Sequence, residues 1–233
     1  MKHKNTKLPF VFLNLAMTAD GKIATAGRAP LALGSERDRE HMLELRATAD
    51  AVLNGARTAD LNAITMGPGA AKYRRQRLRR GLMEYNLRVI VSGSGSLDPQ
   101  AEVFKRRFSP IVILTTHRAS PARLKALRAV ADEVKIFGAK ELDFRRAFRW
   151  LREKWNVRRL LCEGGGEIDD ALFRAGVVDE LHLMISPKIC GGRNAPTICD
   201  GVGFPKLSQA VPLELQSLRR EGDEMFFVYR VAR

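Results

Sequence analysis

Residues 158–169 read RRLLCEGGGEID, and the organisation of the whole chain can be worked out from this stretch. The apolar run 160–162 is typical of a buried strand, three glycines follow, and the next residues suit a helix. A strand that turns tightly into a helix is the basic unit of α/β proteins. Glycines before a helix N-terminus also let an anion such as pyrophosphate approach the backbone. The Lys-Ser/Thr of a P-loop and the third glycine of the dinucleotide fingerprint are missing, so an anion site and a plain turn both stay open.

The alternation of short apolar runs with longer helical segments continues on both sides of this stretch. The runs predict nine strands, at residues 10–16, 51–53, 88–91, 111–115, 133–137, 159–162, 180–186, 213–219 and 225–231. Helices are predicted at residues 35–48, 121–130, 143–154 and 168–175, and residues 67–81 are expected to be the most irregular. The last two strands have only a turn between them and should pair antiparallel. We therefore predict a basic tail at residues 1–8 that need not be ordered and a single α/β domain at 9–233, with a mostly parallel sheet and an antiparallel C-terminal edge.

The charge of the chain is strongly positive, with 40 Lys and Arg against 26 Asp and Glu and a formal net charge of +14. The apolar content of 45% is too high for a disordered basic tail. Residues 72–80 carry six positive charges in nine positions and could contact a phosphate backbone. Only Tyr73 offers a stacking face there, and no nucleic-acid-binding signature accompanies it. A solvated basic surface is the preferred interpretation, followed by binding of anionic small molecules.

The three cysteines form no C-x-x-C pair, so neither a disulfide scaffold nor a four-thiolate zinc site is predicted. The apolar run after the basic N-terminus is broken by Asn14 and reads as a strand, not as a signal peptide. No run of eighteen apolar residues is present. A soluble, cytoplasmic protein without a metal and without a membrane partner is expected.

Four motifs, in this order, resemble the reductase domain of the bifunctional riboflavin-biosynthesis deaminase/reductase. They are NLAMTADGKIA at 14–24, LRATADAVLNGART at 45–58, EGG at 163–165 and AGVVDEL at 175–181, the last with Pro187 and Gly191-Gly192 after it. The resemblance covers nearly the whole chain from residue 9. The zinc signature of the deaminase half, His-x-Glu before Pro-Cys-x-x-Cys, does not occur, so a stand-alone reductase is expected.

The resemblance implies a three-layer, dihydrofolate-reductase-like α/β fold with helices on both faces of the sheet, and a homodimer. It also implies an enzyme of riboflavin biosynthesis that uses NADPH. The substrate would be 5-amino-6-(5-phosphoribosylamino)uracil or the diamino-pyrimidinone equivalent, whose ribosyl group is reduced to a ribityl chain. In such a reaction the cofactor performs the difficult step while the protein places it and excludes water.

Carried over residue by residue, the resemblance places Ala16, Thr58, Gly165 and Gly166 at the cofactor. The further candidates for the cofactor site are Asn62, Ser92, Gly164 and Glu167. Arg46 would hold the substrate phosphate. Glu163 and Lys22 would contact the polar edge of the pyrimidine, because a carboxylate accepts hydrogen bonds and an ammonium only donates them. The catalytic set would be Glu163, Lys22, Asn62 and Asp60.

Some positions depart from the family pattern. Asn62 stands where the family has an acid, and Asp60 is the candidate to replace it. Pro30 and Ala32 stand where a serine and an aromatic residue are usual, and an arginine of residues 72–80 could replace the family's substrate-binding arginine. Ser92 and Arg118, after two strands, could select the 2′-phosphate of NADPH over NADH.

These departures leave two alternatives open. One is an NADPH-dependent reductase of another pyrimidine or pteridine, motivated by Asn62, Pro30 and Ala32. The other is a basic nucleic-acid-binding module, disfavoured but motivated by the charge of residues 72–80.

Overall fold

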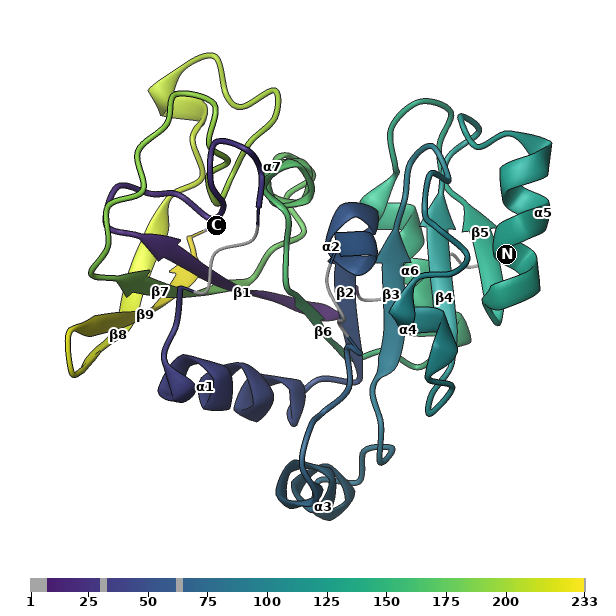
Figure 1. Cartoon of the computed structure of the whole chain (residues 1–233), viewed down its shortest axis with the longest axis horizontal. Coiled ribbons are helices and arrows are strands. Elements are labelled where there is room, and N and C mark those ends of the chain that lie inside the picture. Colours follow the sequence, from purple (N-terminus) through teal and green to yellow (C-terminus); the bar gives the residue numbers. More distant parts are fainter. Residues whose placement is uncertain (1–7, 30–32, 62–64, 233) are drawn as a thin grey trace, which may run out of the picture. The chain divides into compact units, whose positions relative to one another are not determined.

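The computed structural model describes residues 8–29, 33–61 and 65–232 (Figure 1). The chain divides into two compact units. The first contains residues 1–10 and 46–161, and the second contains residues 11–45 and 162–233. The single domain that the sequence suggests for residues 9–233 stays a prediction.

The first unit contains a parallel sheet. Its strands are β2 (Ala51–Gly55), β3 (Leu87–Val91), β4 (Ile111–Thr115), β5 (Glu133–Ile136) and β6 (Arg159–Cys162). They follow the order β5-β4-β3-β2-β6, and the pairs β2–β3, β3–β4 and β4–β5 are parallel. Every residue of β2, β3 and β4 is buried. This burial explains why the strands, apart from Asn54 in β2 and Arg88 in β3, read as apolar runs and not as alternating ones.

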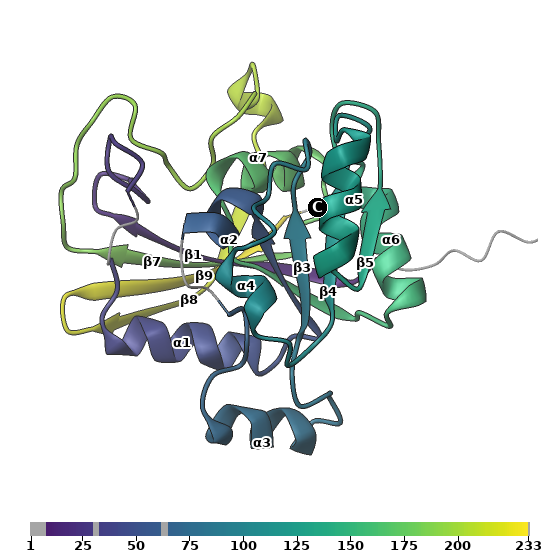
Figure 2. The same ribbon diagram turned by 45° about the vertical axis from the view of Figure 1, so that its right-hand side comes forward.

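Helices cover both faces of this sheet. They are α2 (Ala56–Leu61), α3 (Ala71–Arg79), α4 (Glu102–Lys105), α5 (Pro121–Val130) and α6 (Phe144–Lys154). The helices α2, α4 and α5 lie on one face and α6 on the other, as right-handed crossovers require (Figures 1 and 2). The apolar stripe of α6 is buried as expected, through Phe144, Phe148 and Leu151.

The helix α3 corrects the expectation that residues 67–81 would be the most irregular part of the chain. Its buried positions are Tyr73 and Arg77, one turn apart, whereas the apolar Leu78 is 55% exposed. The pattern of apolar residues therefore carries no helical period here, because an inward position is occupied by an arginine.

The second unit contains the mixed part of the sheet. Its elements are β1 (Phe10–Thr18), α1 (Glu36–Arg46), α7 (Gly166–Arg174), β7 (Glu180–Ser186), a 3-10 turn (Leu207–Gln209), β8 (Leu213–Glu221) and β9 (Glu224–Val231). The strand order is β1-β7-β9-β8, with β1–β7 parallel and both β7–β9 and β8–β9 antiparallel. The nine expected strands and the antiparallel C-terminal edge are therefore confirmed.

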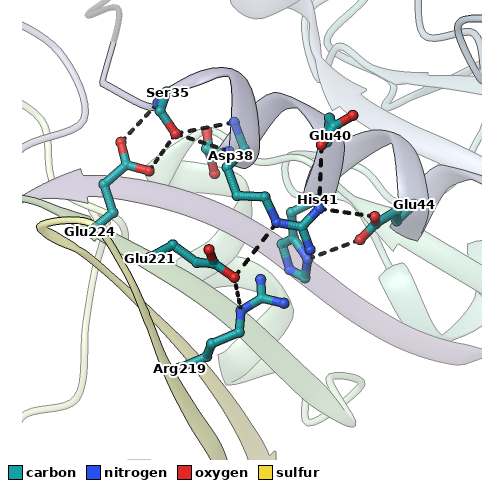
Figure 3. A network of polar contacts seen from close by, with 9 residues as sticks. Ser35, Asp38, Glu40, His41, Glu44, Arg219, Glu221 and Glu224 are labelled. Atoms are coloured by element: carbon teal, nitrogen blue, oxygen red, sulfur yellow. Dashed lines mark hydrogen bonds and ion pairs between the residues drawn. The ribbon is translucent and has the colours of Figure 1, made fainter.

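In this unit α1 packs against one face of the strands, and α7 lies on the opposite face (Figures 1 and 2). The ring of His41 lies 5.5 Å from that of His182 on β7 and 5.6 Å from that of Phe226 on β9. Polar contacts extend this packing to the β8–β9 hairpin (Figure 3). The hydroxyl of Ser35 caps α1 by accepting from the Arg37 amide and itself donates to Glu224 at 2.7 Å.

No helix within the described residues is both long and apolar enough to cross a bilayer.

Candidate active site

The glycine turn between β6 and α7 serves packing at two positions and leaves open space at the third. A Cβ on Gly166 would lie 2.5 Å from the carbonyl oxygen of Thr197, and one on Gly164 would lie 2.8 Å from a carboxyl oxygen of Asp169. A Cβ on Gly165 would meet nothing within 4 Å, although its φ of 118° itself favours glycine. Of the three glycines, Gly165 is the one whose backbone a ligand can approach.

A buried acid lies beneath this turn. Asp169 is fully buried in α7, and burial raises the pKa of its carboxyl well above the ordinary value. Its Oδ1 accepts from the Cys162 thiol at 3.7 Å, and burial likewise raises the pKa of that thiol.

Three more of the predicted residues belong to this unit, and two of them flank the glycine turn in the sequence. Glu163 directly precedes the glycines and is half-buried, and Glu167 is exposed in the first turn of α7. Ala16 lies on β1 and packs against the buried cluster of Leu33, Met184 and Phe226.

Lys22 lies in the turn after β1 and is held in place by the segment 190–200. Its Nζ donates to the carbonyl oxygen of Ala195 at 3.3 Å, and its backbone pairs with Thr197. Thr197 is also the residue that packs against Gly166. Lys22 and the glycine turn are therefore both held by the same segment.

Asp20 fixes the other end of that segment. Its carboxylate accepts from the Thr18 hydroxyl at 2.6 Å and from the amides of Cys190 at 3.1 Å and Gly191 at 2.7 Å. These hydrogen bonds, led by that from Thr18, lower the pKa of Asp20 to about 2. Asp20 therefore has a structural role, which is to hold the start of this segment against the end of β1. The role of Thr197 was missed, because no motif marks its contact with Gly166, thirty-one positions earlier. The role of Asp169 was also missed, because an acid in the first turn of a helix is usually exposed.

In the first unit, Arg46 is buried at the end of α1. Its Nη1 donates to the carbonyl oxygen of Gly67 at 2.9 Å. Thr58 is half-buried in α2. Asp60, near the end of the same helix, accepts from the Asp98 amide at 3.0 Å, and partial desolvation raises its pKa. Asn62, Pro30 and Ala32 lie outside the described residues.

The loops after β3 and β4 form a second group of polar atoms in this unit. The Ser92 hydroxyl at the end of β3 is buried and has no hydrogen-bond partner among the described residues. A Cβ on the next residue, Gly93, would meet nothing within 4 Å. The hydroxyl of Thr116 donates to the Gly93 carbonyl at 2.7 Å and accepts from the Arg118 amide at 3.2 Å. The two loops thus present a hydroxyl and an open backbone at the carboxyl ends of parallel strands, where ligands of open α/β sheets bind.

The basic run 72–80 is partly committed to the fold. Arg77 is fully buried and binds backbone carbonyls, and Arg74 contacts Tyr85 and Glu84. The exposed guanidinium groups are those of Arg75, Arg79 and Arg80. This division weakens the argument for a nucleic-acid-binding segment.

The mostly parallel sheet with its antiparallel edge and the helices on its faces define an α/β protein. The chain belongs to the RibD C-terminal domain family, whose model matches residues 9–227.

Individual relatives agree with this assignment. The chain is 32% identical, over 96% of its own length and 98% of the relative's, to the 2,5-diamino-6-ribosylamino-4(3H)-pyrimidinone 5′-phosphate reductase of Methanothermobacter thermautotrophicus. A solved pyrimidine reductase-like protein of Corynebacterium diphtheriae is similar with a TM-score of 0.80 and 24% identity, covering 97% of this chain and 92% of that one. RibD of Acinetobacter baumannii matches with a TM-score of 0.77 and 18% identity, covering 97% of this chain and 58% of that one. At these identities the two solved structures show the fold alone.

Proposed function

We propose that the protein is an oxidoreductase of riboflavin biosynthesis that reduces the ribosyl group of a phosphoribosylamino-pyrimidine to a ribityl chain. The diamino-pyrimidinone form is the preferred substrate, and 5-amino-6-(5-phosphoribosylamino)uracil is its close equivalent. The main support is the named pyrimidinone phosphate reductase that matches over 96% of the chain.

We propose NADPH as the cofactor. Gly165 offers an open backbone at the N-terminus of α7, which suits a pyrophosphate. The buried Ser92 hydroxyl without a partner and the open Gly93 suit a second polar group of a dinucleotide, and Arg118 nearby would favour a 2′-phosphate. When bound, NADPH supplies a hydride to the sugar carbon that is bonded to nitrogen.

The substrate is held by charged groups in this proposal. Arg46 binds the phosphate, since a guanidinium fits phosphate oxygens in a bidentate way. Lys22 uses one of its N–H groups on the Ala195 carbonyl and keeps two for a pyrimidine carbonyl. Glu163 accepts from the N–H groups of the ring. Asp60 or Asn62 stands near the position of the family acid, and the raised pKa of Asp60 suits a group that gives up a proton.

The proposal includes a homodimer. The outer strand β8 is exposed along nearly all its length, and Leu213, Leu215 and Leu218 are 40%, 54% and 51% exposed. The register places these leucines on the same face as Phe227 and Tyr229, so the hairpin presents an apolar surface. Sedimentation should show a dimer for the wild type and a monomer for Leu215→Glu/Leu218→Glu, with Ser217→Glu on the opposite face as the control.

Cytoplasmic location is also part of the proposal, since the three cysteines are free, as in a reducing compartment.

The function is tested by following NADPH oxidation by the purified protein with the diamino-pyrimidinone phosphate as substrate. Turnover with NADPH, and much weaker turnover with NADH, is expected. Tight NADPH binding without turnover would favour the alternative, a reductase of another pyrimidine or pteridine. Restored growth of a reductase-deficient strain without added riboflavin would argue against that alternative.

A further inference from the structure

The end of α1 is held by two side chains that come from distant parts of the first unit. The Nη1 of Arg77 donates to the carbonyl oxygens of Arg46 at 2.8 Å and Ala49 at 2.5 Å. The Nδ2 of Asn86 donates to the same two oxygens at 2.8 Å and 2.7 Å. The last carbonyls of a helix have no acceptor role inside the helix, and they form the negative end of its dipole. A cation and an amide donor therefore satisfy this helix end together.

Arg77 also ties its own helix to this point. Its Nε donates to the carbonyl oxygen of Met83 at 2.9 Å, so one guanidinium links α3, the segment after α3 and the end of α1. The hydrogen-bond acceptors of Arg77 are all backbone carbonyls. Burial lowers the pKa of Arg77 to about 10, so the group remains a cation at neutral pH.

The residue at the end of α1 is Arg46, to which the proposed function assigns the substrate phosphate. Its backbone carbonyl is fixed by Arg77 and Asn86, and its side chain is fixed by the bond from Nη1 to the Gly67 carbonyl. A guanidinium held at both its backbone and its head group has a defined orientation, which is what phosphate binding needs.

We propose that Arg77 and Asn86 are positioning residues, which act through Arg46 on the binding of the substrate phosphate. This inference rests on the proposed function. Burying a cation costs free energy because the charge loses its water, and an apolar side chain of similar volume often stabilises a fold as well or better. The desolvation cost at position 77 is offset in part by the hydrogen bonds of Arg77 to the carbonyl oxygens of Arg46, Ala49 and Met83.

Arg88 provides a matched control. It is also fully buried, its pKa is also lowered to about 10 by burial, and it also donates to carbonyls, those of Val103 at 2.8 Å and Ser109 at 2.5 Å. None of these acceptors lies in residues 46–49. Arg88→Lys should therefore perturb the interior of the first unit to a similar degree as Arg77→Lys without moving Arg46.

The test uses the full chain with NADPH and steady-state kinetics on the diamino-pyrimidinone phosphate. Arg77→Lys should raise the KM of this substrate at least tenfold, and Asn86→Ala, which removes only the amide donor, about threefold. The KM of NADPH and kcat should stay within twofold, and Arg88→Lys should change none of the three by more than twofold. The KM of the corresponding riboside, which lacks the phosphate, should not respond to Arg77→Lys.

A double-mutant cycle separates a positioning role from general destabilisation. In the Arg46→Ala background, Arg77→Lys should cause no further rise in substrate KM, because Arg77 acts through Arg46. A full additional rise, or equal KM changes in Arg77→Lys and Arg88→Lys, would overturn the inference. If Arg77→Lys does not fold, the same cycle is run with Asn86→Ala and Arg46→Ala. The rise in substrate KM caused by Asn86→Ala should then disappear in the Arg46→Ala background. Absence of turnover in the wild type would instead overturn the proposed function, and this inference with it.

Discussion

Buried charge has opposite signs in the two units. Among the described residues, the buried Arg, Lys, Asp and Glu side chains are Arg46, Arg77 and Arg88 in the first unit and Asp169 and Asp170 in the second. The sequences of the units follow the same division. The first has 28 Lys and Arg against 10 Asp and Glu, a net charge of +18, and the second has 12 against 16, a net charge of −4.

The difference shows two ways of supplying hydrogen-bond partners to backbone groups that lie outside regular helices and strands. In the first unit, buried guanidinium groups donate to carbonyls at the ends of elements, as Arg77 and Arg88 do. In the second, carboxylates accept hydrogen bonds from backbone amides of glycine-rich loops, as Asp170 does from Gly203 and Asp20 from Gly191. Part of the positive excess is therefore structural, and the remainder lies in the first unit, where it would attract anionic ligands.

The largest effect on stability is expected for Arg88→Met. The substitution leaves the carbonyls of Val103 and Ser109 buried without their donor, and each such group costs roughly 1 to 3 kcal/mol. We expect the free energy of unfolding, measured with urea, to fall by about 3 to 4 kcal/mol. The exposed Arg128→Met on α5 should change it by less than about 0.5 kcal/mol. A loss below about 1 kcal/mol for Arg88→Met would contradict a structural role for the buried cation.

The sequence predicted the strands well and the buried cations poorly, for a common physical reason. Runs such as 111–115 are apolar because both faces of the strand are buried, and the composition records this directly. An arginine that binds carbonyls looks like a surface residue in the sequence, and this is why α3, with Arg77 inward and Leu78 outward, was missed.

The candidate site was predictable only in part. Residues 163–167 were found because the glycines stand next to each other, but which glycine stays open depends on Thr197 and Asp169. Contacts of this kind are made by tertiary packing and leave no periodic or local signal. The roles assigned to Glu163, Lys22, Arg46 and Thr58 remain proposals.

In the second unit, the largest effect is expected for Gly166→Ala. The new Cβ would lie 2.5 Å from the Thr197 carbonyl oxygen and 2.9 Å from the Asp200 amide nitrogen, and both are backbone atoms that cannot rotate away. Because of this overpacking, we expect the free energy of unfolding, measured with urea, to fall by about 2 to 3 kcal/mol. Gly93→Ala in the first unit, where the Cβ meets nothing within 4 Å, is the matched control and should be nearly neutral. Equal losses for both variants would mean that segment 197–200 does not pack against the glycine turn.

A smaller effect is expected for Asp170→Asn. The carboxylate accepts from Arg174 Nε at 2.8 Å and from the Gly203 amide at 3.1 Å, and an amide of the same shape weakens both bonds by removing the charge. We expect a loss of about 1.5 kcal/mol, measured by thermal or urea unfolding. Increased hydrogen exchange should be confined to residues 200–204. Unchanged exchange in that loop would show that Asp170 does not hold it.

Between pH 4 and 7, the pH dependence of stability should come mainly from the second unit. The buried arginines Arg77 and Arg88 keep pKa values of about 10 and stay charged over this range. In the second unit, burial and the nearby cations lower the pKa of His41 to about 4, whereas burial, with Glu224 nearby, raises the pKa of Asp38 to about 6. Both groups lie on α1 in the network that joins it to the hairpin (Figure 3).

These two groups oppose each other, and single substitutions should separate them. The unfolded chain binds the His41 proton more readily than the folded one, so this contribution to stability is complete above pH 6.5 and is lost as the pH falls toward 4. Asp38 is protonated more readily in the folded state, so its contribution is present below pH 3.8 and is lost as the pH rises through 6. Asp38→Asn should therefore leave stability rising with pH between 4 and 6.5, and His41→Gln should leave it falling. Because solvent screens both groups, each should change the free energy of unfolding by about 1 kcal/mol across this pH range. Urea unfolding at half-unit pH steps measures this change. Slopes of the same sign in the two variants would exclude this pair as the source, and the pH response would then have to be sought in groups outside α1.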